Sequence, residues 1–208
     1  MIAAAGAPGA AAGAFRYSAF ISYSRMDRET AVRLHQSLEA YVLPAALRAA
    51  GRGLQRPARP LKPIFRDEDE LVPGQNLPER IARALAQSEY LIVICSPNAC
   101  ASEWVEKEIL DFCRLGRVAN ILAVVAAGEP NAAAEGHDAA LEALPRALRF
   151  HVDPGGRITT RPAEPLWVDW RDTARRDRMA FLRMVAALLS LDSLDDLIRR
   201  DARHRRLR

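Results

Sequence analysis

The chain has few of the residues that build metal centres and disulfide frameworks. Among its 208 residues are three cysteines, Cys95, Cys100 and Cys113, and four histidines. No C-x-x-C pair occurs, and no histidine stands at the spacing of a metal ligand. An odd number of cysteines without such spacing argues against a zinc site or a disulfide framework. We therefore expect reduced thiols, no bound metal and a cytoplasmic location.

Long hydrophobic runs are also missing. The longest apolar runs, Leu91–Cys95 and Ile121–Ala127, are far too short to span a bilayer. The first 14 residues, MIAAAGAPGAAAGA, lack the basic n-region of a signal peptide. We expect them to form a disordered tail.

The sequence also lacks the motifs of several common nucleotide and ester chemistries. No G-x-G-x-x-G and no G-x-x-x-x-G-K-[ST] occurs, so the phosphate cradles of dehydrogenases and P-loop proteins are absent. No G-x-S-x-G occurs, which excludes the nucleophile elbow of α/β-hydrolases. A phosphoryl-accepting receiver domain is disfavoured because its acidic residues follow the first strand, where this chain has Ser22-Tyr-Ser-Arg25.

The charge of the chain is balanced except at its end. Hydrophobic residues make up 50% and charged residues 27%, as in a globular protein, and the net charge is +4. Residues 198–208 hold six arginines against one aspartate, and the remainder is close to neutral. A nucleic-acid partner is therefore not expected. The segment 191–208 is interpreted as a solvated basic end, or as a linker to a missing module. It would be a membrane tether only if the natural chain continued past Arg208.

Apolar periodicity predicts strands that alternate with helices. Asp27 and Ser102 are expected to cap two of the helices, because their side chains can accept from unpaired backbone N–H groups. Residues 128–165 are expected to be mostly loop, with one short helix at 139–144. The expected strands are 17–23, 62–65, 90–95, 120–126 and 166–170, and the expected helices are 28–43, 78–87, 102–116, 173–189 and 193–200.

This alternation predicts an α/β fold. We expect a flavodoxin-like doubly wound parallel sheet of about five strands with helices on both faces. Ligands of such sheets bind beyond the carboxyl ends of the strands, where the strand order reverses. The segments Ser22–Arg25, Phe65–Asp67 and Cys95–Asn98 should therefore meet at one edge, together with the region of Glu108.

Four motifs in order carry a family resemblance. They are Phe20-Ile-Ser-Tyr-Ser24, Phe65-Arg-Asp67 followed by Leu-x-Pro-Gly, the strand and turn Ile-Val-Ile-Cys-Ser-Pro, and Trp104-Val-x-x-Glu108. Together they resemble a Toll/interleukin-1 receptor (TIR) domain of the bacterial kind. The resemblance assigns residues 15–190 to this domain. The stretches 44–61 and 128–165 depart from the compact family pattern.

The resemblance implies two activities. One is cleavage of NAD+, as substrate and with no prosthetic group, at the nicotinamide–ribose bond to give nicotinamide and ADP-ribose or a cyclic form. This activity would be switched on by self-assembly with other TIR domains as a homo-oligomer, in bacterial defence or signalling. The alternative is a non-catalytic TIR interaction module for signal transduction. A third interpretation is a nucleoside-processing transferase with a similar fold and a glutamate.

The resemblance also implies a set of site residues. Glu108 takes the catalytic position, and the residues implied in nucleotide binding are Tyr23, Ser24, Arg25, Phe65, Arg66, Asp69 and Trp104. Because nicotinamide on ribose is cationic and leaves as a neutral molecule, a single carboxylate can suffice to stabilise the oxocarbenium-like transition state.

Structural interpretations of the same residues stay open. Glu108 lies at the border of the stripe formed by Val105, Ile109 and Phe112, and a border glutamate is usually solvated. Trp104 can be a wedge that anchors its helix instead of a wall of the site. Arg25 can be a solvent-exposed loop residue, and the acidic stretch 66–70 can be an ordinary solvated loop.

Overall fold

A parallel sheet forms the centre of the computed structural model, which describes residues 15–43, 61–66, 77–132, 134–171, 177–191 and 194–206. Within these ranges the sheet has five strands in the order β2-β1-β3-β4-β7, and each neighbouring pair is parallel. The strands are β1 (Tyr17–Ser22), β2 (Ile64–Arg66), β3 (Ser88–Cys95), β4 (Ile121–Val125) and β7 (Trp167–Asp169). The strand order reverses between β1 and β3. The expected flavodoxin-like doubly wound sheet is thereby confirmed.

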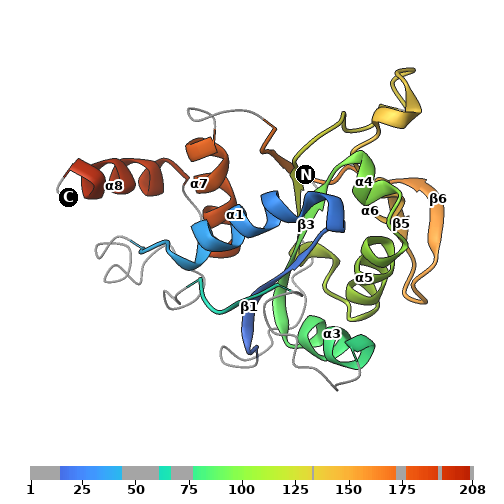
Figure 1. Ribbon diagram of the computed structural model, residues 1–208, viewed down its shortest axis with the longest axis horizontal. Coiled ribbons are helices and arrows are strands. Elements are labelled where there is room, and N and C mark those ends of the chain that lie inside the picture. Colours follow the sequence, from blue (N-terminus) through green and yellow to red (C-terminus); the bar gives the residue numbers. More distant parts are fainter. Residues whose placement is uncertain are drawn as a thin grey trace, which may run out of the picture.

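Helices cover both faces of the sheet (Figure 1). One face packs against α3 (Leu77–Ala86) and α5 (Glu103–Arg114), and the other against α1 (Arg28–Glu39), α7 (Asp177–Leu188) and α8 (Leu194–Arg206). The period-2 alternation of β1 sends Phe20 to the α3/α5 face and Ala19 and Ile21 to the α1/α7 face. Because helices cover both faces of the sheet, side chains on both sides of β3 are buried, and its sequence contains a continuous apolar run.

Short elements connect these layers. They are η1 (Arg25–Asp27), α4 (Pro97–Cys100), η3 (Val118–Asn120), η4 (Ala139–Leu141) and α6 (Arg146–Arg149). The helix expected at 139–144 is a single 3-10 turn, and a second short helix follows it.

The expectation of a loop up to residue 165 is wrong in its second half. Strands β5 (Phe150–Val152) and β6 (Ile158–Pro162) form an antiparallel hairpin that lies outside the main sheet, on the side of α5 and α6 (Figure 1). The hairpin contributes Val152 and Ile158 to the core beneath α5.

The carboxyl-terminal helix is more than a solvated basic end. Leu197 of α8 is fully buried, and Ile198 packs beside it against the α1/α7 core. The Asp201 carboxylate, also buried, pairs with Arg178 of α7 through Nε at 3.1 Å. The part of the basic segment that the structure describes therefore belongs to the folded body, although α8 extends from it at one end of the molecule (Figure 1).

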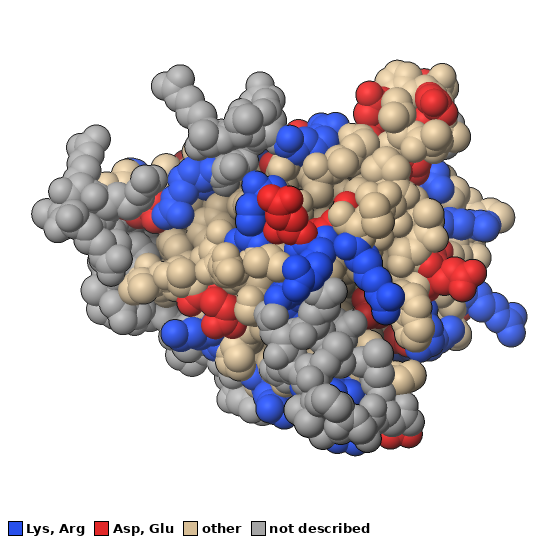
Figure 2. Space-filling view, viewed as in Figure 1, with Lys and Arg blue, Asp and Glu red and all other residues tan. Residues whose placement is uncertain are grey.

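The outer surface mixes both signs of charge. Figure 2 shows Lys and Arg side chains interspersed with Asp and Glu side chains over the described part of this face. Among the described helices, none combines the length and the apolar character needed to cross a membrane.

Candidate active site

Helix α5 carries the glutamate implied by the family resemblance. The helix is preceded by its N-cap, Ser102, whose hydroxyl accepts a hydrogen bond of 3.4 Å from the Val105 N–H, as expected. It ends before Gly116, whose φ of +73° is the left-handed conformation common after helix ends. The apolar stripe is buried as expected. Glu108 is buried with it, with 9% of the residue exposed. The solvated-glutamate interpretation is therefore wrong.

A side chain at the end of β1 holds this carboxylate. The Ser22 hydroxyl donates a hydrogen bond of 2.5 Å to Glu108 Oε2, and Ser22 itself is 1% exposed. The length lies in the range of charge-assisted O–H···O⁻ bonds. The contact brings a carboxylate of α5 to the carboxyl end of β1, next to the point where the strand order reverses. This is the edge at which doubly wound sheets bind ligands.

The residues after β1 line the same edge. Tyr23 is half-buried and Ser24 is 8% exposed, whereas Arg25, in η1, is exposed. Arg66, at the end of β2, is 4% exposed, and its Nη1 donates to the Tyr23 hydroxyl at 3.3 Å. The ends of β1 and β2 are thus joined through a tyrosine and a buried guanidinium. Of the two arginines at this edge, Arg66 is buried and Arg25 is exposed to solvent.

Phe65 is a core residue and the expectation that it contacts a nucleotide is not supported. It is 2% exposed. Its ring stacks on Phe20 with centroids 5.1 Å apart and meets Tyr17 edge-on at 5.2 Å. Both contacts consume the ring surface that a bound base would need. Tyr23 remains as the aromatic candidate beside the strand ends.

Trp104 lies one helical turn before Glu108 and is 55% exposed. This exposure argues against a buried wedge that anchors α5. The Lys107 ammonium lies 5.7 Å from the centre of the indole ring, within cation–π distance. The ring therefore presents an exposed aromatic surface on the Glu108 helix. Asp69, the other expected contact residue, lies outside the described residues.

Asp27 fixes the turn after β1 to the turn after β3. It stands at the N-cap position of α1 but makes no side-chain capping hydrogen bond there, contrary to expectation. Its Oδ2 accepts from the Ser96 hydroxyl at 2.6 Å and its Oδ1 from the Asn98 amide at 3.3 Å. The carboxylate thus joins two loops across the switch point of the sheet.

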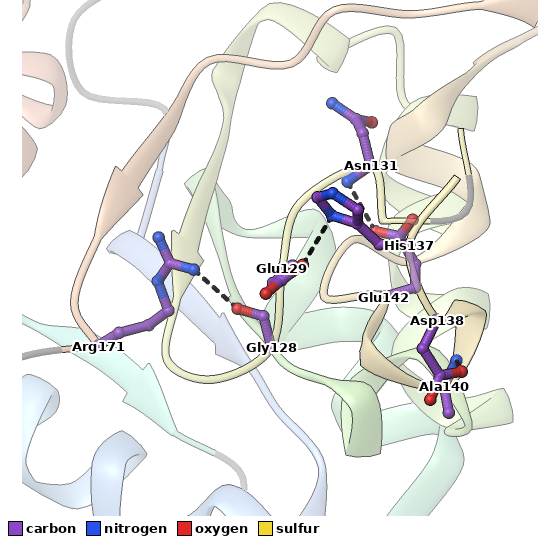
Figure 3. Close-up of polar contacts among 8 residues, drawn as sticks. All are labelled: Gly128, Glu129, Asn131, His137, Asp138, Ala140, Glu142 and Arg171. Atoms are coloured by element: carbon purple, nitrogen blue, oxygen red, sulfur yellow. Dashed lines mark hydrogen bonds and ion pairs between the residues drawn. The ribbon is translucent and has the colours of Figure 1, made fainter. Parts of the chain in front are cut away.

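Hydrogen bonds at Gly128 and at Glu142 anchor the segment after β4 (Figure 3). Arg171 Nη1 donates to the Gly128 carbonyl at 2.8 Å. A Cβ on Gly128 would stand 2.5 Å from the Leu141 carbonyl oxygen, so only glycine fits there. The buried Glu142 carboxylate accepts from the N–H groups of Asn131 and Leu144 at 3.1 and 2.9 Å. This departure from the compact family pattern is therefore a fixed part of the body at the carboxyl edge.

The sequence pattern places Ser22 at this edge and Asp27 at a helix cap, but it does not predict that Ser22 contacts Glu108 or that Asp27 contacts Ser96. A signal for Ser22 was present, since strand alternation sends Ser22 to the same face as Phe20, toward α5. Within the described part of the chain, no group of three or more His, Cys, Asp or Glu side chains is arranged to hold a metal ion.

The fold and this edge define a flavodoxin-like α/β domain with a buried carboxylate at its switch point. The model of the TIR domain family matches residues 19–186, and the chain belongs to that family. It is 33% identical over 192 residues to a curated protein of Actinoplanes sp. (strain SE50/110) named NAD(+) hydrolase ApTIR. The match covers 88% of this chain and 25% of the relative, so the chain spans about a quarter of the relative's length.

Two solved structures are also similar. One is the TIR domain of the Toll-related receptor TRR-2 of Hydra magnipapillata, with 18% identity, a TM-score of 0.46 and coverage of 81% of this chain and 94% of that one. The other comes from the TIR domains of the activated Roq1 resistosome, with 18% identity, a TM-score of 0.42 and coverage of 58% and 64%.

Proposed function

We propose that this chain is a TIR-domain NAD+ nucleosidase with Glu108 as its catalytic carboxylate. The observation that carries the proposal is the 2.5 Å hydrogen bond that holds the buried Glu108 at the carboxyl end of β1. The name of the Actinoplanes relative, an NAD(+) hydrolase, supports the same substrate.

The chemistry needs one carboxylate. The bond between ribose C1′ and the pyridinium nitrogen breaks, its electron pair goes to that nitrogen, and neutral nicotinamide leaves. Glu108 stabilises the positive charge that develops on the ribose. Water then adds to C1′ and loses a proton to give ADP-ribose, or an atom of the same molecule adds and closes a cyclic product.

Other residues of the edge supply binding. Arg25 is exposed and can meet the pyrophosphate with two parallel hydrogen bonds. Tyr23 and Trp104 offer aromatic surface for a flat ring. Ser24, Arg66 and Asp69 complete the proposed set. Phe65 is left out because its ring is packed in the core.

We further propose that the domain acts in the cytoplasm of a bacterium and is switched on by TIR–TIR self-association. Assembly would raise the population of the competent arrangement of the loops around the site. The domain boundaries proposed from the sequence are 15–190. The packing of Leu197 and Asp201 argues for extending the folded unit through α8.

The test is nicotinamide release from NAD+ at high protein concentration. Glu108→Gln keeps the size of the side chain but removes its charge, and it should abolish release. Glu103→Gln, an exposed glutamate on the same helix, is the matched control and should retain activity. If the wild type releases no nicotinamide, even at high protein concentration, the non-catalytic adaptor is favoured. Turnover of free nucleosides in place of NAD+ would favour the transferase.

A further inference from the structure

We propose that Ser22 is a positioning residue that orients the Glu108 carboxylate for bond cleavage. This inference rests on the proposed function and adds a residue to it. Ser22 is the last residue of β1 and its hydroxyl donates to Glu108 Oε2 at 2.5 Å.

The backbone fixes where this hydroxyl points. Ser22 pairs in register with Val93 of the central strand β3, so its backbone is held in the sheet at the carboxyl edge. Alternation along β1 places it on the same face as Phe20, toward α5. The donor is therefore attached to a strand that is flanked by β2 and β3 in the sheet. A long glutamate side chain, by contrast, has several rotatable bonds and needs such a partner to keep one orientation.

The burial of Ser22 indicates that it positions Glu108 and does not contact the substrate directly. Ser22 is 1% exposed and Glu108 is 9% exposed. A substrate can reach the glutamate at its exposed margin, whereas the serine lies behind it. Ser22 thus acts through Glu108.

The hydrogen bond also offsets the cost of burying the carboxylate. A buried carboxylate without a donor is strongly disfavoured, whereas a charge-assisted hydrogen bond compensates for lost water. Ser22→Ala removes this donor without adding bulk. Misplacement of a catalytic group by an ångström lowers rates by up to about a hundredfold, so we expect kcat to fall by roughly tenfold to a hundredfold. The KM for NAD+ should stay within about threefold, because Ser22 does not touch the substrate.

Two further variants of this position isolate the hydroxyl. Ser22→Thr keeps the donor and should recover part of the lost kcat. Ser22→Cys keeps nearly the same size but offers only a weak S–H donor, and it should behave like Ser22→Ala.

The matched control is Ser88→Ala. Ser88 is another fully buried serine of the same sheet, and its hydroxyl also makes a hydrogen bond, to the Ala84 carbonyl at 2.8 Å. It lies at the amino-terminal end of β3, at the opposite edge. Its loss should lower the thermal midpoint about as much as Ser22→Ala does, but should leave kcat unchanged.

The experiment combines kinetics with crystal structures of the wild-type chain and Ser22→Ala. We expect low kcat for Ser22→Ala, near-normal KM, partial recovery in Ser22→Thr, and a Glu108 carboxylate that is rotated or spread over several orientations. Equal loss of kcat in Ser88→Ala, or a Glu108 carboxylate that keeps its place in Ser22→Ala, would overturn the proposal. A wild type that releases no nicotinamide would refute the proposed function alone, since the two crystal structures would still decide whether Ser22 orients Glu108.

Discussion

The hydroxyl of Ser96, in the turn after β3, donates a 2.6 Å hydrogen bond to the Asp27 carboxylate in the turn after β1. The same hydroxyl accepts from the Ala99 N–H at 3.0 Å and so caps α4. One aspartate therefore connects two loops and a helix start across the switch point. The turn that carries Tyr23, Ser24 and Arg25 is fixed from its far end.

Asp27→Ala should loosen this turn. We expect kcat/KM for NAD+ cleavage to fall about tenfold, since the binding residues of the turn lose their fixed geometry. The free energy of unfolding should drop by about 1–2 kcal/mol, because the buried Ser96 hydroxyl loses its acceptor. Steady-state kinetics and urea unfolding measure the two effects.

The control is Asp111→Ala, which removes ion pairs with Lys107 and Arg114 along α5. It should change neither kcat/KM nor the free energy of unfolding much. Unaltered kcat/KM in Asp27→Ala would show that the tie is irrelevant to catalysis.

These contacts explain why part of the site escaped the sequence. Asp27 satisfies every local rule for a helix cap, yet its carboxylate is used by Ser96, which is 69 residues away. Helical spacing places Glu108 at the border of its stripe. It is nevertheless buried, and Ser22, 86 residues away, donates a hydrogen bond to its carboxylate. Periodicity within one helix contains no information about such partners.

The elements that were predicted well have strong local signals. β3 is a long apolar run, and α5 combines an N-cap serine, a regular stripe and a terminal glycine. The β5–β6 hairpin has none of these. Its strands are short and only partly buried, and its sequence pattern does not separate it from a loop. Phe65 was misjudged for a related reason: the motif places it at a strand end, but its packing against Tyr17 and Phe20 is a tertiary contact.

Asp201→Ala should weaken the docking of α8 on α7. The Asp201 carboxylate is buried against Arg178, which also lies over the rings of Tyr41 and Phe181. Removing one partner leaves the guanidinium without its counter-charge in a partly buried place. We expect a loss of about 2 kcal/mol in the free energy of unfolding, measured by urea denaturation. Asp195→Ala, an exposed aspartate on the same helix, is the control and should cost less than about 0.5 kcal/mol. Equal effects of the two changes would mean that α8 is not docked through this ion pair.

Cys113 should react slowly with alkylating reagents in the native protein. Burial raises the pKa of its thiol to about 11, although the nearby Arg114 acts in the opposite direction. At pH 8 only about one thiol in a thousand is then ionised, and the thiolate is the reactive form. Cys113 nevertheless lines a cavity of about 340 Å³, together with Ile121 and Leu148, so the reagent has space to approach.

Peptide mass spectrometry after iodoacetamide treatment measures this rate. Modification of Cys113 should be at least tenfold slower in the native chain than in urea, and should speed up steadily from pH 8 to pH 10. Rapid, pH-independent labelling of the native chain would contradict the proposed control by ionisation.

Tyr41→Phe should reduce the loss of stability that the fold undergoes at alkaline pH. Burial, and secondarily Asp201, raise the pKa of the Tyr41 hydroxyl to about 12, while Arg178 opposes them. The unfolded chain has a tyrosine pKa near 10, so the neutral hydroxyl is favoured by folding. The contribution of the neutral Tyr41 hydroxyl to the free energy of unfolding is fully present below about pH 10 and is lost as pH rises through about 12.

The variant lacks the titrating group, so its stability should fall less than that of the wild type between pH 10 and pH 12. Because Tyr41 is only partly buried, solvent screening limits the difference to about 1 kcal/mol. At pH 7 the two proteins should be similar or the variant slightly more stable, since the Tyr41 hydroxyl oxygen is buried and has no hydrogen-bond partner among the described residues. Urea unfolding at pH 7, 10 and 11.5 measures the free energy of unfolding of both proteins. Parallel pH dependence of the two would show that Tyr41 does not titrate in this range.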